Sequence, residues 1–311
     1  MSRSRLRWAV GTTAILAAVL LAAAAFPAGD GDLLIRPEGH PAIAWWRAAS
    51  APTRWDGRKT PLADAVAWRP GAVGVEWGEL QLGGPGEARA LRLIVVRLDP
   101  AKSDLSLAWG LGTRPRWLLD NAPASAALAV NAGMFVDALP WGWVVIGGRE
   151  RLTPGHGSLS SALVVRRDGT VAWIDGDDLS SWRGNPDVAF AFQSYPTLLV
   201  GDGEVPSALQ GGETINLSHR DARMALGIDR QGRLLLALTR LDLELPGADR
   251  VPLGVTVPEM AAVMGALGAR QAVSLDGGIS AQLMLRDAEG EAHRWPGLRR
   301  VPLALVATPR R

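Results

Sequence analysis

Residues 254–278 read GVTVPEMAAVMGALGARQAVSLDGG, in which a helix signal is followed at once by a strand signal. Thr256 and Glu259 have the spacing of a capping box, an arrangement that begins many helices. The apolar residues after them predict a helix that ends at Gly268, and residues 271–275 then predict a strand. The segment indicates a domain in which helices and strands are combined.

The chain before this segment predicts mainly strands. Short apolar runs bounded by Gly, Pro and Asp lie at residues 91–98 and 105–109. Two pairs of runs flank turn sequences and predict β-hairpins; they are residues 162–165 with 171–174, and residues 223–228 with 233–238. We therefore expect an α+β fold, with a β-rich mixed-sheet core and a few helices, in a single domain over residues 71–308.

An apolar run at residues 8–26 follows three arginines near the N-terminus. As a helix it is long enough to cover the roughly 30 Å hydrocarbon core of a bilayer. Its small residues at 22–25 also resemble a signal-peptide cleavage site. We expect residues 1–28 to be a signal peptide or a membrane anchor, and the two alternatives stay open. Both predict that the rest of the chain is periplasmic or extracellular, anchored to the inner membrane if the segment is not cleaved.

Residues 29–70 are rich in Pro, Ala and Trp and show weak periodicity. This composition favours a linker and lead-in to the domain, with tryptophans that are able to pack onto it.

The composition excludes several kinds of function. The formal net charge is only +2, so no basic surface for nucleic acid is expected. The chain has no Cys, which rules out disulfides, thiolate nucleophiles and Cys-ligated metals. Its 4 His residues show no HxH or HExxH spacing, so we expect neither a metal site nor another cofactor.

Two carboxylates in the opening segment have both a structural and a chemical interpretation. Asp276 follows the predicted strand and precedes Gly277 and Gly278, where the backbone can approach a ligand closely. The same residue types also suit a tight turn. Glu259 is either only the acid of the capping box or a reacting group as well.

Polar residues also stand beside other predicted strands. Asn131 ends an apolar run, and Ser194 precedes another. Arg223 begins the run that enters the second predicted hairpin, shortly after His219 and Asp221. A guanidinium in that position can pair with a carboxylate or hold two phosphate oxygens at once.

Five of these segments, taken in order, resemble the successive motifs of the phosphodiester glycosidase family. They are residues 131–135 (NAGMF), 194–196 (SYP), 223–227 (RMALG), 254–259 (GVTVPE) and 275–278 (LDGG). The match in order and spacing extends from about residue 75 to the C-terminus. Two positions depart from the usual family pattern: Ile279 replaces the third glycine of Asp-Gly-Gly-Gly-Ser, and Met224 replaces the Thr or Ser after the arginine.

The resemblance implies an enzyme that removes a sugar joined through its C1 to a phosphodiester. It implies a carbohydrate phosphodiester as the partner, in an envelope or extracellular glycan. Such cleavage normally uses two carboxyl groups. The residues implied as catalytic are Asp276, Glu259, Arg223 and Asn131. Those implied as substrate-binding are Gly277, Gly278, Ser280, Ser194, His219 and Asp221. Asp221 is also a third candidate for a reacting carboxylate.

Two other functions remain open at this level. A metal-dependent phosphodiesterase would cleave the P–O bond, although it normally needs clustered His and Asp ligands. A glycan-binding or envelope scaffold protein without activity could use the same fold, because a fold does not fix a function.

Overall fold

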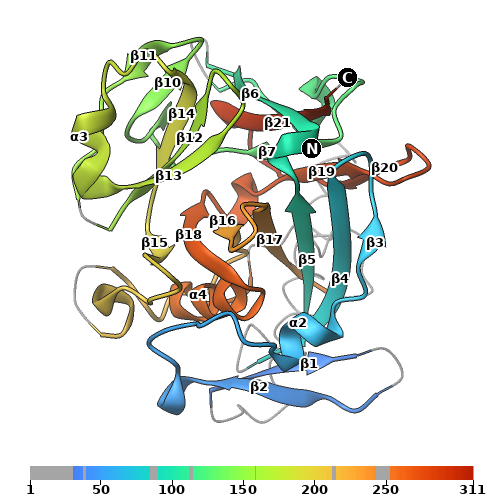
Figure 1. Cartoon of the computed structure of the whole chain (residues 1–311). Helices are drawn as coiled ribbons and strands as arrows, with labels where there is room; N and C mark the ends of the chain where they lie inside the picture. Colours follow the sequence, from blue (N-terminus) through green and yellow to red (C-terminus); the bar gives the residue numbers. More distant parts are fainter. Residues whose placement is uncertain are drawn as a thin grey trace, which may run out of the picture.

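The computed structural model of the chain is drawn in Figure 1. It describes residues 31–37, 40–84, 90–111, 115–157, 159–211, 215–242 and 253–310. The predicted signal peptide or anchor at residues 1–28 lies outside the described residues. Within the described part of the chain, no helix is both long and apolar enough to cross a membrane.

The largest sheet has nine strands and forms the centre of the domain. Its order is β15 (Thr197–Leu199), β18 (Ala269–Leu275), β16 (Met224–Asp229), β17 (Leu234–Leu241), β5 (Leu91–Leu98), β4 (Val75–Gly83), β1 (Asp32–Arg36) and β2 (Ile43–Arg47), with β3 (Arg69–Pro70) paired to β4. Helices α4 (Val257–Ala266) and α2 (Pro61–Ala65) lie together with β1 and β2 in the lower part of Figure 1.

Two five-stranded sheets lie in the upper part of the view in Figure 1. One has the order β11 (Arg149–Leu152), β10 (Val144–Ile146), β14 (Val188–Ser194), β12 (Ser161–Arg166) and β13 (Val171–Asp175), followed in the chain after β13 by the short helix α3 (Leu179–Trp182). The other has the order β20 (Ala292–Trp295), β19 (Leu283–Arg286), β7 (Leu128–Asn131), β21 (Leu303–Pro309) and β6 (Ser103–Trp109). Strands β8 (Phe135–Val136) and β9 (Leu139–Pro140) form a separate small hairpin.

The central sheet is apolar on both faces, and β5 shows why. Side chains alternate between the two faces of a strand. Leu93 and Val95 of β5 belong to the core that includes α4. Ile94 and Val96 belong to a second core that the central sheet shares with both smaller sheets. Near-continuous apolar runs such as residues 91–98 are therefore expected of these strands.

The predicted hairpins are confirmed, but the prediction of a mixed sheet is wrong. Strands β12 and β13 pair, as do β16 and β17. Every ladder between described strands is antiparallel, including that of β18 with β16. The helical connection through α4 does bring β18 parallel to β17, but β16 lies between them. A helix between two strands in the chain therefore creates no parallel ladder here.

The expectation of a linker at residues 29–70 also needs correction, because β1, β2, α2 and β3 all lie within it. Leu33 of β1 is completely buried, and β1 pairs with β4 of the central sheet. The backbone nitrogen of Trp55 donates to the carbonyl oxygen of Gly203 at 2.7 Å. Its indole lies against Gly265 of α4, where a Cβ atom would collide with the ring. These short strands, bounded by Pro and Gly, carry too few residues to show their periodicity.

Replacing Gly265 by Ala tests whether this N-terminal segment is part of the folded domain. Alanine is the better helix former by up to about 1 kcal/mol. We nevertheless expect Gly265→Ala to lower the free energy of unfolding by about 1 to 3 kcal/mol, because the added methyl overpacks the contact with Trp55. In a Trp55→Ala background the same change should be neutral or stabilising. Urea unfolding of the wild type, the two single variants and the double variant measures the coupling between Gly265 and Trp55. An equal effect of Gly265→Ala in both backgrounds would show that Trp55 does not pack on α4.

Candidate active site

The backbone around Asp276 is fixed by Asn131. Asp276 directly follows β18, and its backbone nitrogen donates to the carbonyl oxygen of Gly133 at 2.9 Å. Nδ2 of Asn131 donates to the carbonyl oxygen of Asp276 at 2.9 Å, and Oδ1 accepts from the backbone nitrogen of Gln282 at 2.9 Å. Asn131 is completely buried. Its amide therefore connects the end of β7 to both sides of the turn that carries Asp276.

The two glycines after Asp276 allow this turn to contact residues 221–222. The backbone nitrogen of Gly278 donates to the carbonyl oxygen of Ala222 at 2.7 Å. A Cβ atom at Gly277 would collide with that same oxygen. Gly278 has φ +55°, and a Cβ atom there would lie 3.0 Å from Oδ2 of Asp221. The glycines thus bring the carboxylate of Asp221 close to the turn of Asp276.

Asp276 is an unusually basic carboxylate. Its pKa is raised from 3.8 to about 6, chiefly because burial deprives the charged carboxylate of hydration. The nearby charge of Asp221 contributes to this increase. A hydrogen bond with the Ser280 side chain and the positive charge of Arg299 act in the opposite direction. The site therefore combines two carboxylates in one electrostatic environment, which is a common property of catalytic centres.

Arg223 follows Asp221 in the chain and directly precedes β16. Its Nε donates to the carbonyl oxygen of Val255 at 3.2 Å, and its Nη2 donates to that of His219 at 2.8 Å. Burial lowers the pKa of Arg223, whereas the charges of Asp221 and Glu259 raise it. The guanidinium plane is therefore held by the backbone and lies among carboxylates.

His219 and Asp221 contact each other loosely. Nε2 of His219 lies 3.9 Å from Oδ2 of Asp221, and the His219 side chain is exposed. Asp221 is held through its backbone, whose nitrogen donates to the carbonyl oxygen of Val255 at 3.2 Å. Val255 thus receives hydrogen bonds from both Asp221 and Arg223, which fixes the spacing between these two residues.

The carboxylate of Glu259 has more hydrogen-bond partners than the capping box alone would give it. The predicted capping box is confirmed: the backbone nitrogen of Thr256 donates to Oε2 of Glu259 at 2.9 Å, and that of Glu259 donates to the Thr256 hydroxyl. Arg220 also binds both carboxylate oxygens, with Nη1–Oε2 and Nη2–Oε1 distances of 2.7 Å. The side chain is buried. Arg220 was missed in the sequence because its importance depends on a partner 39 residues away.

The two predicted serines occupy different positions. Ser194, at the end of β14, is completely buried, and its hydroxyl donates to the carbonyl oxygen of Ser274 in β18. It joins a smaller sheet to the central sheet beneath the site. Ser280 is also buried, but its side chain bonds to the carboxylate of Asp276. Of the two, only Ser280 contacts a candidate reacting group.

Arg299 is a site residue that the sequence analysis missed. Its charge acts on Asp276, and its backbone nitrogen donates to the carbonyl oxygen of Ile279 at 3.0 Å. The guanidinium carbon lies 5.0 Å from the centre of the Phe135 ring. Residues 296–300 (PGLRR) form a short loop segment with no recognisable pattern, so only the folded chain reveals this position.

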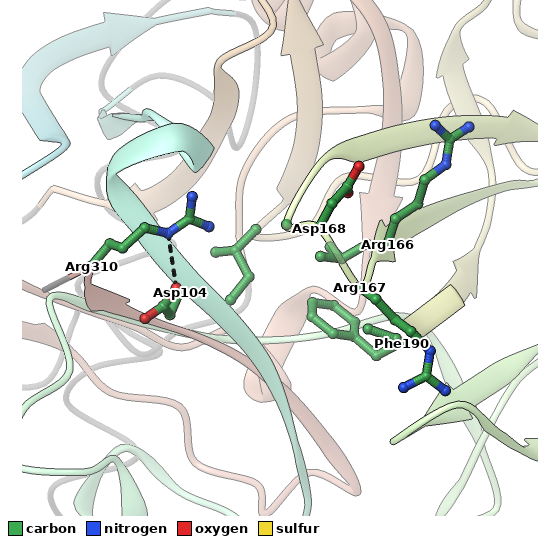
Figure 2. Close-up of a pocket in the computed structure, with 10 residues that line it drawn as sticks. Asp104, Arg166, Arg167, Asp168, Phe190 and Arg310 are labelled. Atoms are coloured by element: carbon green, nitrogen blue, oxygen red, sulfur yellow. Dashed lines mark hydrogen bonds and ion pairs between the residues drawn. The ribbon is translucent and has the colours of Figure 1, made fainter. Parts of the chain in front are cut away.

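The cavity in Figure 2 is lined by a different set of residues. It has a volume of about 350 Å³ and is lined by the β12–β13 turn, β14, β6 and the end of the chain. Figure 2 shows Arg310 paired with Asp104 on one wall and Asp168 on the other. None of the candidate catalytic or substrate-binding residues lines it. In the part of the chain that the structure describes, no group of three or more His, Asp and Glu side chains could hold a metal ion.

Three solved structures align with the chain, and the first of them has a TM-score above 0.5, which shows a similar fold. The catalytic domain of zebrafish N-acetylglucosamine-1-phosphodiester alpha-N-acetylglucosaminidase, auto-inhibited by its pro-peptide, aligns with a TM-score of 0.57 and 16% identity, covering 80% of this chain and 92% of that one. A hypothetical protein from Synechocystis aligns with a TM-score of 0.47 and 16% identity, covering 90% and 68%. A protein from Burkholderia pseudomallei aligns with a TM-score of 0.42 and 18% identity, covering 73% of this chain and 75% of that one.

The sequence itself matches no curated protein significantly. The family model for phosphodiester glycosidases, in contrast, matches residues 124–308, which is more than half of the chain. The matched region includes Asn131, Asp221, Arg223 and Asp276, the residues that the fold gathers around one turn. The chain therefore belongs to the phosphodiester glycosidase family.

Proposed function

We propose that the chain is an exported hydrolase that cleaves the C1–O bond of a sugar-1-phosphodiester in an envelope or extracellular glycan. The observation that carries the proposal is the approach of Asp276 and Asp221 across Gly278, with the fixed guanidinium of Arg223 beside them. Cleavage at C1 passes through an oxocarbenium-like state that carboxylates stabilise. The departing phosphate carries negative charge, which a guanidinium can neutralise.

In this proposal Asp276 reacts in its ionised form. A phosphate leaves readily, so the reaction depends little on a general acid. Burial makes the Asp276 carboxylate a stronger base than an ordinary aspartate, because its charge is poorly hydrated. We therefore assign to Asp276 the attack on C1, either directly or through a water molecule.

The second reacting carboxylate in this proposal is Asp221 rather than Glu259. Both oxygens of Glu259 are bound by Arg220, and one of them also accepts from Thr256. A carboxylate held in this way has little freedom to form a bond with C1. We assign to Glu259 the positioning of Arg220 and of the first turn of α4, next to Val255, which holds Asp221 and Arg223.

Arg223 is assigned to the phosphate. The backbone carbonyls of Val255 and His219 orient the guanidinium through Nε and Nη2. Nη1 makes neither of these contacts and is assigned to a phosphate oxygen. Gly277 and the exposed His219 form the surroundings that the substrate would meet, while Gly278 is buried.

Replacing Asp276 by Asn should separate chemistry from stability. Asn keeps the shape but cannot attack C1, so hydrolysis should fall by at least about a thousandfold. The folded pKa of about 6 exceeds the ordinary 3.8, so the charge of Asp276 destabilises the fold increasingly from about pH 4 to 6 and fully above that. Asp276→Asn should therefore unfold at the same or a higher temperature at pH 7.

The pH dependence of the wild-type protein completes this test. Since the ionised form of Asp276 reacts, kcat/KM should rise with pH and level off above about 6. The measurement uses a sugar-1-phosphodiester and thermal unfolding in the same buffers. Near-wild-type rates in the Asn variant, or activity that declines as the pH rises through 6, would contradict the assignment.

Arg223→Lys tests recognition of the phosphate. Lysine keeps the charge but loses the planar fork. A charge-assisted contact contributes roughly 1.5 to 3 kcal/mol, so kcat/KM for a phosphodiester should fall about ten- to a hundredfold. The loss should be much smaller for an uncharged aryl glycoside of the same sugar.

A matched control for this variant is Arg233→Lys. Arg233 lies at the far end of the β16–β17 hairpin and pairs with Asp229 at 2.8 Å, away from the candidate residues. It should affect neither substrate. Equal losses on both substrates in Arg223→Lys, with the fold intact, would show that Arg223 does not bind phosphate.

A further inference from the structure

Two large apolar side chains are exposed beside the carboxylates. Ile279 is 41% exposed and Leu298 is 57% exposed. The two residues lie in different loops, yet the backbone nitrogen of Leu298 donates to the carbonyl oxygen of Ile279 at 2.8 Å. Single exposed apolar residues are common on protein surfaces, whereas two that the fold brings together next to a reactive site call for an explanation.

Ile279 stands at the centre of the candidate site. It lies between Gly278, which packs against Asp221, and Ser280, whose side chain bonds to Asp276. These neighbours are determined by the chain itself, because the three residues form one short 3-10 turn. An apolar group bound over Ile279 would therefore lie on the same short turn that contacts Asp276 and Asp221.

Backbone contacts hold together the two loops that carry the patch formed by Ile279 and Leu298. A Cβ atom at Gly297 would lie 3.1 Å from the carbonyl oxygens of Ile279, Ser280 and Ala281, so the two loops are in close contact. The buried guanidinium of Arg240 donates to the carbonyl oxygen of Ala281 in one loop and to that of Pro296, at 3.3 Å, in the other. A patch that is already ordered loses little entropy when a ligand binds.

Arg299 adds a positive charge to this patch. It follows Leu298 and is exposed, and the stack on Phe135 restrains its guanidinium. A cation beside two apolar side chains is complementary to a phosphate group that continues into a hydrocarbon. A phosphate followed by a second sugar would offer hydroxyl groups to Ile279 and Leu298, which neither can bind.

We propose that Ile279, Leu298 and Arg299 form a subsite for the leaving group, and that the substrate is a sugar-1-phosphodiester of a hydrocarbon alcohol. This inference rests on the proposed function. In the reaction, the C1–O bond breaks and its oxygen stays on phosphorus. The oxygen of water bonds to C1, and its displaced proton is released. The products are the free sugar and an alkyl phosphate monoester.

The test compares ligands that differ only in hydrocarbon length. Methyl phosphate and octyl phosphate are titrated into the whole protein by calorimetry, and the methyl and octyl diesters of the same sugar 1-phosphate are assayed for hydrolysis. Each methylene that leaves water is expected to strengthen binding up to about fourfold. We expect octyl phosphate to bind at least ten times more tightly than methyl phosphate, and kcat/KM to follow the same order.

The double variant Ile279→Ser, Leu298→Ser should bind octyl phosphate and methyl phosphate about equally. Its octyl-to-methyl ratio should be near 1 both for the affinity and for kcat/KM. The control is Ile43→Ser, since Ile43 has the same side chain, is 43% exposed and lies on β2 at the far edge of the central sheet. This control should keep the ratio. Thermal unfolding verifies that each variant is folded.

The calorimetric titrations distinguish a failure of this inference from a failure of the proposed function. An octyl preference that depends on Ile279 and Leu298, without hydrolysis of either diester, would support the subsite and contradict the proposed function. Hydrolysis of both diesters at equal kcat/KM, together with equal binding of the two phosphates, would overturn the subsite and leave the proposed function intact. An octyl preference that survives the double serine change would also overturn it.

Discussion

The contact between the backbone of Gly277 and Gly278 and that of Ala222 is the constraint on which the site depends. Two chain segments can approach this closely only where neither Cβ atom intervenes. The hydrogen bond from Gly278 to Ala222, at 2.7 Å, then sets the position of Asp221 relative to the turn of Asp276. Asn131 fixes the other side of that turn from β7. A side chain at Gly277 would separate the two carboxylates even if every other residue were kept.

The fold supplies the elements that meet at this contact. Met224, the first residue of β16, pairs with Leu275, the last residue of β18, so the residues flanking these ends lie at one edge of the central sheet. Asn131 is the last residue of β7 and pairs with Ala304 of β21 in a smaller sheet. The apolar core shared by the three sheets holds these strand ends together. The site is thus formed where two sheets join, and burial there also raises the pKa of Asp276.

The sequence predicted the features that depend on neighbouring residues. The capping box of Thr256 and Glu259 is local, as are the β12–β13 and β16–β17 hairpins, and the structure confirms all of them. The strand end at Asp276 was also visible, because two glycines follow an apolar run. Features that depend on distant partners were not predictable. Arg220 binds Glu259 of α4 from a loop that precedes β16, and Arg299 reaches the site only because its loop is bound to Ile279. The strands β1 and β2 were not predicted either, because β1 depends on its pairing with β4 in the distant central sheet.

The central claim is that the bond between C1 and oxygen is broken, rather than a bond to phosphorus. Hydrolysis of a sugar-1-phosphodiester in water enriched in oxygen-18, followed by mass spectrometry of both products, measures this directly. Attack at C1, assisted by Asp276 and Asp221, places the heavy oxygen in the hydroxyl of the released sugar and leaves the phosphate monoester unlabelled. Label in the phosphate, either of the phosphate monoester or of sugar 1-phosphate released together with the free alcohol, would show P–O cleavage and contradict the account.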